Sequence, residues 1–260
     1  MTSLLESLGS FSLDLFQRIG ELWLLFVRTV GYCRQALANR RLILLQMVEI
    51  GVNTVPLVAI MALFTGMVIA VQTGYQAVRF HLEGMVGPIV GLSMTRELGP
   101  VMTGVIVAGR VGAAIAAQVG TMKVTEQIDA LETLATDPVE YLVMPRFVAA
   151  VIMLPVLTVC ADIVGIAGGL VIAVTQLDRD PRLFMTGTFR AMEVSDVLSG
   201  LVKSAFFGMI VAIIGCYQGL TATGGAEGVG KSTTRAVVLS LMLILVSDFF
   251  LTVLILGGKP

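Results

Sequence analysis

The sequence predicts an all-α integral membrane protein, with an N-terminal interfacial helix, about five transmembrane helices and a short cytoplasmic helix. Hydrophobic residues make up 56% of the 260 residues and charged residues only 13%, whereas soluble domains hold roughly 25% charged residues. The mean hydropathy is +0.92. Five segments are long and apolar enough to cross a bilayer, which takes about 20 mostly apolar residues per helix. These observations exclude a soluble globular domain.

The chain divides into an amphipathic N-terminal segment, residues 1–45, and a transmembrane region, residues 46–260. Apolar residues from Leu8 to Phe26 recur at helical spacing, opposite a polar face. We therefore expect a helix that lies on the membrane surface. Trp23 and the arginines that follow it favour an anionic cytoplasmic surface. A helix packed within a soluble domain is the alternative interpretation.

The transmembrane region holds five predicted spans, at residues 50–73, 89–119, 147–175, 197–220 and 236–256. Lys and Arg are more frequent in the segments on the N-terminal side of the membrane, so we expect a cytoplasmic N-terminus and a C-terminus on the outer side. Pro100 and Pro155 fall inside spans, where proline kinks or breaks a helix. The sequence shows no internal repeat, although many secondary transporters are built from one.

Small residues recur every four positions along the second predicted span. They are Gly104, Ala108, Gly112, Ala116 and Gly120. A helix face with almost no side chains lets another backbone approach closely. We therefore expect a tightly packed helix contact along this face, either within one subunit or between two.

An acidic amphipathic helix is predicted at residues 124–136. Its acidic residues share one face and its apolar residues another: Glu126, Asp129 and Glu132 against Val124, Ile128, Leu131 and Ala135. The Asp137-Pro138 pair is expected to end the helix, because the residue before proline is disfavoured in the helical conformation. The helix is either a docking surface for another protein or a solvated loop helix whose acids keep it off an anionic leaflet.

Ionisable residues interrupt the apolar spans, where they are costly and indicate function. Arg96 and Glu97 precede Leu98 in the second span. Arg96 would meet an anionic headgroup in a cavity, since a guanidinium matches phosphate geometry; the alternative is a pair that reaches to the outer interface. Four more ionisable residues lie within or at the ends of spans: Arg110, Asp162, Lys203 and Asp248. They would form charge pairs between helices, or alternatively a proton relay.

The segment 225–232, GAEGVGKS, matches the phosphate-loop pattern G-x-x-x-x-G-K-[ST]. We reject a nucleotide site, because a phosphate loop joins a strand to a helix and needs an Asp on a second strand. Apolar spans lie on both sides of this segment, so we expect a Gly-rich cytoplasmic turn instead.

Other kinds of site have no support in the sequence. Three widely spaced cysteines and a single histidine, His81, indicate no metal site. No nucleophile stands beside a base, so catalysis is not expected. A net charge of -1 without a basic stripe excludes nucleic acid as a partner.

Several short motifs occur together in one order. They are Arg96-Glu-Leu-Gly-Pro100, Ala108-Gly-Arg110, Gly120-Thr-Met122, Thr125-Glu-Gln-Ile-Asp-Ala-Leu131, Asp137-Pro138, Pro145-Arg146 and Thr233-Thr-Arg235. In these motifs the chain, from about residue 40 onward, resembles the MlaE/YrbE family of ABC-transporter permeases. One departure is Gln118, where the family usually has an acidic residue.

The resemblance implies a homodimeric, non-catalytic permease of the bacterial inner membrane, which moves phospholipids between inner and outer membranes and maintains outer-membrane lipid asymmetry. It implies three partners: a cytoplasmic ABC ATPase that binds ATP and magnesium, a periplasmic MCE-domain protein and a small STAS-like accessory protein. This chain itself would bind no cofactor.

The same likeness assigns roles to residues. Arg96, Glu97 and Leu98 would line the lipid pathway. The acidic helix would be a coupling helix that docks on the ATPase through Glu126, Gln127, Asp129, Leu131 and Glu132. Two other functions stay open: an ion-coupled secondary transporter that uses the intramembrane charges, and a membrane scaffold that transports nothing.

Overall fold

The structure is a computed structural model, and it describes residues 2–36, 39–80 and 82–257. All regular elements in these ranges are helices, which confirms the all-α prediction. His81 lies outside the described residues.

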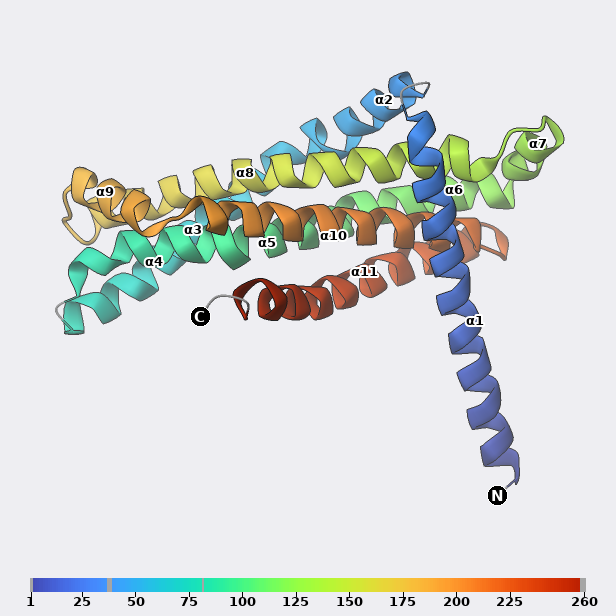
Figure 1. The fold of residues 1–260 in the computed structure, drawn as a ribbon, viewed down its shortest axis with the longest axis horizontal. Helices are drawn as coiled ribbons and strands as arrows, with labels where there is room; N and C mark the ends of the chain where they lie inside the picture. The colour runs from blue at the N-terminus through green and yellow to red at the C-terminus, as the bar shows by residue number, and fades with distance from the viewer. Residues whose placement is uncertain (1, 37–38, 81, 258–260) are drawn as a thin grey trace.

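Five helical segments are long and apolar enough to span a membrane. They cover Arg40–Phe80, Val86–Val124, Val139–Thr175, Val194–Leu220 and Gly225–Ile255. In Figure 1 these segments run roughly along the long axis of the molecule, side by side. The predicted number of five spans is thereby confirmed, and each segment begins before its predicted first residue, because apolarity marks the part in lipid and not the end of the helix. The chain is a multi-pass membrane protein.

Short 3-10 and π turns join consecutive α-helices within the first two spans. The first span contains α2, Arg40–Ile50, and α3, Val55–Phe80. The second contains α4, Val86–Ser93, α5, Gly99–Val107, and α6, Ala113–Val124. The last three spans contain α8, Met144–Thr175, α10, Val194–Leu220, and α11, Gly225–Leu256. A short helix, α9, Pro181–Ala191, packs against α4 at one end of the bundle.

The second span is interrupted by two π turns, η4 at Met94–Leu98 and η5 at Ala108–Gly112. Pro100 is the second residue after η4, and a π turn widens the helix where a proline ring would otherwise meet the preceding turn. The helical segment therefore continues past Pro100. Likewise α8 continues through Pro155 without a break.

The predicted small-residue face is a contact within the chain. A side chain at Gly104 would meet Phe207 of α10 at 3.1 Å, and one at Gly112 would meet Val211 of α10 at 3.2 Å. Further along, a side chain at Gly120 would meet Ala222 at 3.3 Å. Small residues thus let the second span seat directly against α10, as expected for close helix packing in lipid.

The closest backbone approach lies elsewhere, between α3 and α8. A Cβ atom at Gly66 would overlap the carbonyl oxygen of Gly165, and one at Gly168 would overlap the carbonyl of Leu63. Ala62 and Ala70, one turn on either side of Gly66, are buried. Small residues at every fourth position, from Ala62 to Gly74, mark this contact in the sequence.

The N-terminal helix α1, Thr2–Tyr32, crosses the bundle at a steep angle near one end, and its first half projects beyond it (Figure 1). Two hydrogen bonds fasten it: the Tyr217 hydroxyl donates to Glu21 at 2.8 Å, and the Tyr32 hydroxyl donates to Asp137 at 2.5 Å. Hydrogen bonds from Gln17 and Tyr217 lower the pKa of Glu21, and the bond to Asp137 raises the pKa of Tyr32. A helix at this angle to the spans has the direction of an interfacial helix.

The segment that matches the phosphate-loop pattern is helical, so the expected Gly-rich turn is wrong. The turn lies just before it, and Gly224 adopts a left-handed conformation with a φ of 87° that suits glycine. α11 then begins at Gly225, and Lys231 pairs with Glu227 one turn earlier at 2.6 Å. The described residues contain no strand that could precede a phosphate loop.

Candidate functional site

A cluster of charged side chains lies inside the bundle, between η4, α10 and α11. At its centre is Lys203, whose side chain is 2% exposed. Its Nζ donates to Glu97 Oε2 at 2.7 Å, to Thr252 Oγ1 at 2.7 Å and to the Arg96 carbonyl at 3.1 Å. An ammonium has three donors, so every donor of this buried lysine is used.

Asp248 completes the charge balance around Lys203. Its Oδ1 lies 3.1 Å from Nζ, and its side chain is 19% exposed. This oxygen makes the ion pair without forming a hydrogen bond. Two carboxylates, Glu97 and Asp248, therefore hold one ammonium, which is the condition under which a charge is tolerated inside an apolar bundle.

The local sequence explains why a lysine can reach the backbone here. In an α-helix the Arg96 carbonyl would accept from the N–H of residue 100, but that residue is proline and has no N–H. The carbonyl is therefore available to Lys203. Because Pro100 has no N–H, the carbonyl oxygen of Arg96 can accept a hydrogen bond from the buried ammonium of Lys203.

The side chains of Arg96 and Glu97 are the partly exposed members of the cluster. Arg96 pairs with Asp196 at 2.8 Å, and the side chain of Asp196 is 3% exposed whereas that of Arg96 is 36% exposed. Glu97 is 38% exposed. Each of these two side chains pairs with a buried residue of opposite charge, Arg96 with Asp196 and Glu97 with Lys203. The ion pairs fix their orientation, and both side chains stay partly accessible.

The cluster lies toward the end of the bundle that is opposite α7. Arg96 is 10 residues from the start of its span at Val86, about 15 Å along the helix at 1.5 Å per residue, and 28 residues from its end at Val124. Leu98 is half-buried beside the cluster. The cluster therefore lies between the helices of the bundle, near the end where α10 begins and α11 ends.

The structure brings together only some of the predicted intramembrane charges. Lys203 and Asp248 form the expected pair between helices. Arg110, by contrast, donates to the hydroxyl of Thr54, and Asp162 is buried on α8 with no hydrogen-bond partner for its Oδ1 among the described residues. A Cβ atom at Gly99 would overlap the Asp162 carboxylate, so this acid packs against the backbone behind the cluster.

Sequence reasoning missed two members of the cluster. Asp196 stands one residue before the predicted fourth span, so it is not among the predicted intramembrane charges. Thr252 looked like an ordinary residue of an apolar helix, although it follows Asp248 by one turn and donates to that residue's carbonyl at 2.7 Å. A polar side chain one turn from an intramembrane acid is the signal that could have revealed it.

The predicted acidic helix is shorter than expected. α7 covers Gln127–Thr133, whereas the prediction was residues 124–136. Glu126 and Ala135 adopt left-handed backbone conformations, with φ of 60° and 57°, so they bound the helix on either side. The helix therefore ends before Asp137-Pro138, and Asp137 instead accepts a hydrogen bond from the Val139 N–H at 2.8 Å.

Two faces are present on α7 as predicted, but Val124 and Ala135 of the predicted apolar face lie outside the helix, and Ala135 is exposed. Ile128 is buried and Leu131 half-buried against the rest of the chain, whereas the polar residues are exposed: Glu126, Gln127, Asp129 and Glu132. Asp129 also pairs with Lys123 at 2.8 Å. An exposed acidic surface thus projects from the same end of the bundle as α1 (Figure 1).

Comparison with known proteins identifies the family. The family model described as Permease MlaE matches residues 43–254. A probable ABC transporter permease protein of Rickettsia felis is 46% identical over 95% of this chain and 91% of its own length. One from Synechocystis sp. is 46% identical over 94% of this chain and 92% of its own length.

A plant relative is also similar. The Arabidopsis thaliana protein TRIGALACTOSYLDIACYLGLYCEROL 1, chloroplastic, is 39% identical over 80% of this chain and 59% of its own length. The family match covers the second, third and fourth spans and nearly all of the first and the last, together with the charged cluster and α7. This chain belongs to the MlaE permease family of ABC transporters.

Proposed function

We propose that this chain is the membrane subunit of an ATP-driven transporter that moves phospholipids between the inner and outer membranes of a bacterium and maintains outer-membrane lipid asymmetry. The observation that carries the proposal is the charged cluster between the apolar spans, where Lys203 and Asp196 hold Glu97 and Arg96 in fixed, partly exposed positions. A guanidinium offers paired donors to a phosphate, and Arg96 is the cation of this cluster that remains accessible.

The cluster suits transient binding of a lipid headgroup. Its described members carry two positive and three negative charges: Arg96 and Lys203 against Glu97, Asp196 and Asp248. A phosphate would therefore bind at Arg96 in competition with Asp196. Binding that is neither too weak for entry nor too strong for release is what passage through a site requires.

A second copy of the chain is part of the proposal. α11 is the least buried of the spans: 11% of its most apolar stretch is buried, against 28–50% for the others. Asp248 and Thr252 lie on this same helix. A symmetric pair that meets through α11 would place two charged clusters on opposite sides of one pathway, which a single chain of five spans encloses poorly.

Energy would come from a separate cytoplasmic ATPase, which holds ATP and magnesium and docks on the exposed acidic face of α7. Charged residues around a docked helix set its register and its choice of partner. An MCE-domain protein would receive or deliver lipid on the periplasmic side, and a small STAS-like protein would accompany the ATPase. In this arrangement the N-terminus is cytoplasmic and the C-terminus periplasmic.

Purification in mild detergent, followed by identification of the bound partners and lipids by mass spectrometry, tests the proposal. We expect an ABC ATPase and phospholipids to accompany the chain. Reconstituted complex should transfer labelled phospholipid when ATP is added. Transport that is driven by a proton gradient without ATP would contradict the proposal and support an ion-coupled transporter.

A further inference from the structure

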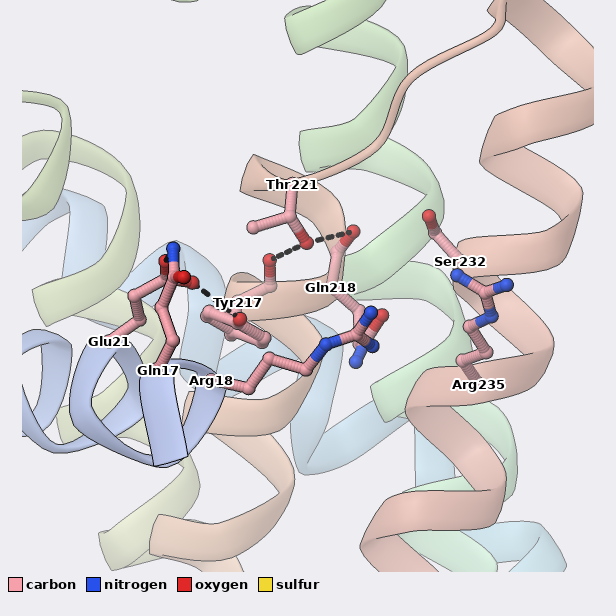
Figure 2. Close-up of a pocket in the computed structure, with 8 residues that line it drawn as sticks. All are labelled: Gln17, Arg18, Glu21, Tyr217, Gln218, Thr221, Ser232 and Arg235. Carbon is pink, nitrogen blue, oxygen red and sulfur yellow. Dashed lines mark hydrogen bonds between the residues drawn. The ribbon is translucent and has the colours of Figure 1, made fainter. Parts of the chain in front are cut away.

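A polar cavity of about 320 Å³ lies where α1 crosses α10 and α11, at the other end of the bundle from the charged cluster. Its lining includes Arg18 and Glu21 from α1, Tyr217 and Gln218 from α10, and Ser232 and Arg235 from α11. Figure 2 shows these side chains converging from three helices. The charged cluster at Lys203 is 15 residues away along α10, about 22 Å, so the two sites are separate.

The carboxylate of Glu21 already has hydrogen-bond donors from the protein. Glu21 accepts from the Tyr217 hydroxyl at 2.8 Å and from Gln17 at 3.0 Å, so both carboxylate oxygens are used. No ion pair joins Arg18 or Arg235 to any side chain that the structure describes. Ser232 is 6% exposed and lines the same space. The guanidinium groups of Arg18 and Arg235, on different helices, therefore line a cavity whose carboxylate, Glu21, is already hydrogen-bonded.

An apolar groove of about 440 Å³ lies at the same junction. It is lined by Ile19 and Trp23 of α1, Ile210 and Ile214 of α10, and Leu243 of α11. On both α10 and α11 the residues that line the apolar groove lie closer to the middle of the helix than the residues that line the polar cavity. Gln218 and Ile210 are eight residues apart, as are Arg235 and Leu243, which is about 12 Å at 1.5 Å per residue.

We infer that this junction binds one phospholipid, with its phosphate between Arg18 and Arg235 and an acyl chain in the apolar groove. Paired guanidinium donors recognise phosphate oxygens through strong, charge-assisted hydrogen bonds. The order along two helices, polar and then apolar, matches an amphipathic ligand whose headgroup stays at the membrane surface. The lipid would fasten α1 to the bundle, which is a role apart from transport through the charged cluster.

Free phosphate shares the chemistry of the headgroup, so the experiment must separate the two. Trp23 is the only tryptophan of the chain and lines the groove, and bromine on an acyl chain quenches tryptophan fluorescence on contact. We would titrate the full chain in maltoside micelles with brominated phosphatidylglycerol, with brominated diacylglycerol, and with brominated phosphatidylglycerol in the presence of inorganic phosphate.

The wild type should be quenched to saturation at a low mole fraction of brominated phosphatidylglycerol. The variant Arg18→Gln/Arg235→Gln should need about tenfold more lipid, because it loses two charge-assisted contacts. Brominated diacylglycerol should quench the wild type and the variant alike. Arg28→Gln is the matched control: Arg28 is an exposed arginine of α1 that lines neither cavity, and its titration should match the wild type.

Thermal unfolding and gel filtration would show whether the double variant folds. If it does not, Arg18→Lys replaces it, and this variant should still weaken the titration because an ammonium lacks the paired donors of a guanidinium. Identical titrations of wild type and a folded arginine variant would overturn the inference. Displacement of the brominated phospholipid by inorganic phosphate would assign the cavity to free phosphate and overturn the lipid assignment.

Discussion

Replacing Lys203 by methionine tests the energetics of the charged cluster. The change leaves Glu97 and Asp248 without their shared cation, and breaking a buried ion pair by removing one partner costs about 3–5 kcal/mol. Glu97 is 38% exposed and therefore partly screened by water. We place the loss of unfolding free energy near the lower limit, about 3 kcal/mol.

Thermal unfolding in detergent measures this loss. A chain of this size shifts its Tm by about 2–4 °C for each kcal/mol, so Lys203→Met should lower the Tm by about 6–12 °C. The triple variant Lys203→Met/Glu97→Gln/Asp248→Asn removes the charges together and should recover part of the shift, because no carboxylate is then left unpaired. A single variant within about 2 °C of the wild type, or a triple variant less stable than the single one, would refute the reasoning.

Three further predictions concern other parts of the molecule. Gly112→Leu should lower stability by about 1–3 kcal/mol, because Val211 lies 3.2 Å from the new Cβ; Gly109→Leu, where nothing lies within 4 Å, is the control, and equal Tm values for the two would contradict the packing argument. Glu126→Lys/Asp129→Lys should leave insertion and assembly intact but abolish ATPase binding in a pull-down assay; full ATPase association would show that α7 does not couple. The pKa of Glu21 is lowered from its ordinary value of 4.5, so its contribution to holding α1 is present at neutral pH and is lost as the pH falls through that lowered pKa. Protection of the α1 amides against hydrogen exchange, corrected for the intrinsic exchange rate at each pH, should therefore decrease on acidification, and Tyr217→Phe should weaken this pH dependence; an unchanged pH profile in that variant would argue against the hydrogen bond.

The fold was largely predictable because lipid imposes simple requirements on a sequence. Each crossing needs about 20 apolar residues, and close helix packing needs small residues at every fourth position. Both patterns depend on local sequence alone. The length of α7 was less predictable, because the left-handed conformations of Glu126 and Ala135 that bound it belong to residue types that usually continue a helix.

The candidate site could be predicted only in part. Arg96, Glu97, Lys203 and Asp248 stood out because charges are rare in apolar spans. Their pairing depends on how three distant segments meet, and no spacing in the sequence records that arrangement. The role of Pro100 was also hidden: sequence indicates a helix breaker, whereas the fold uses the missing N–H to leave the Arg96 carbonyl free for Lys203.

The central claim is that Arg96 contacts phospholipid during ATP-driven transfer, held in place by Asp196. The most direct measurement is the rate of labelled-phospholipid transfer by the reconstituted complex with Arg96→Gln, beside Arg110→Gln, an intramembrane arginine that bonds to Thr54 instead. We predict that Arg96→Gln loses about tenfold or more of the ATP-dependent rate while its ATPase still binds, and that Arg110→Gln keeps most of it. Transfer by a folded Arg96→Gln complex at the wild-type rate would contradict the account.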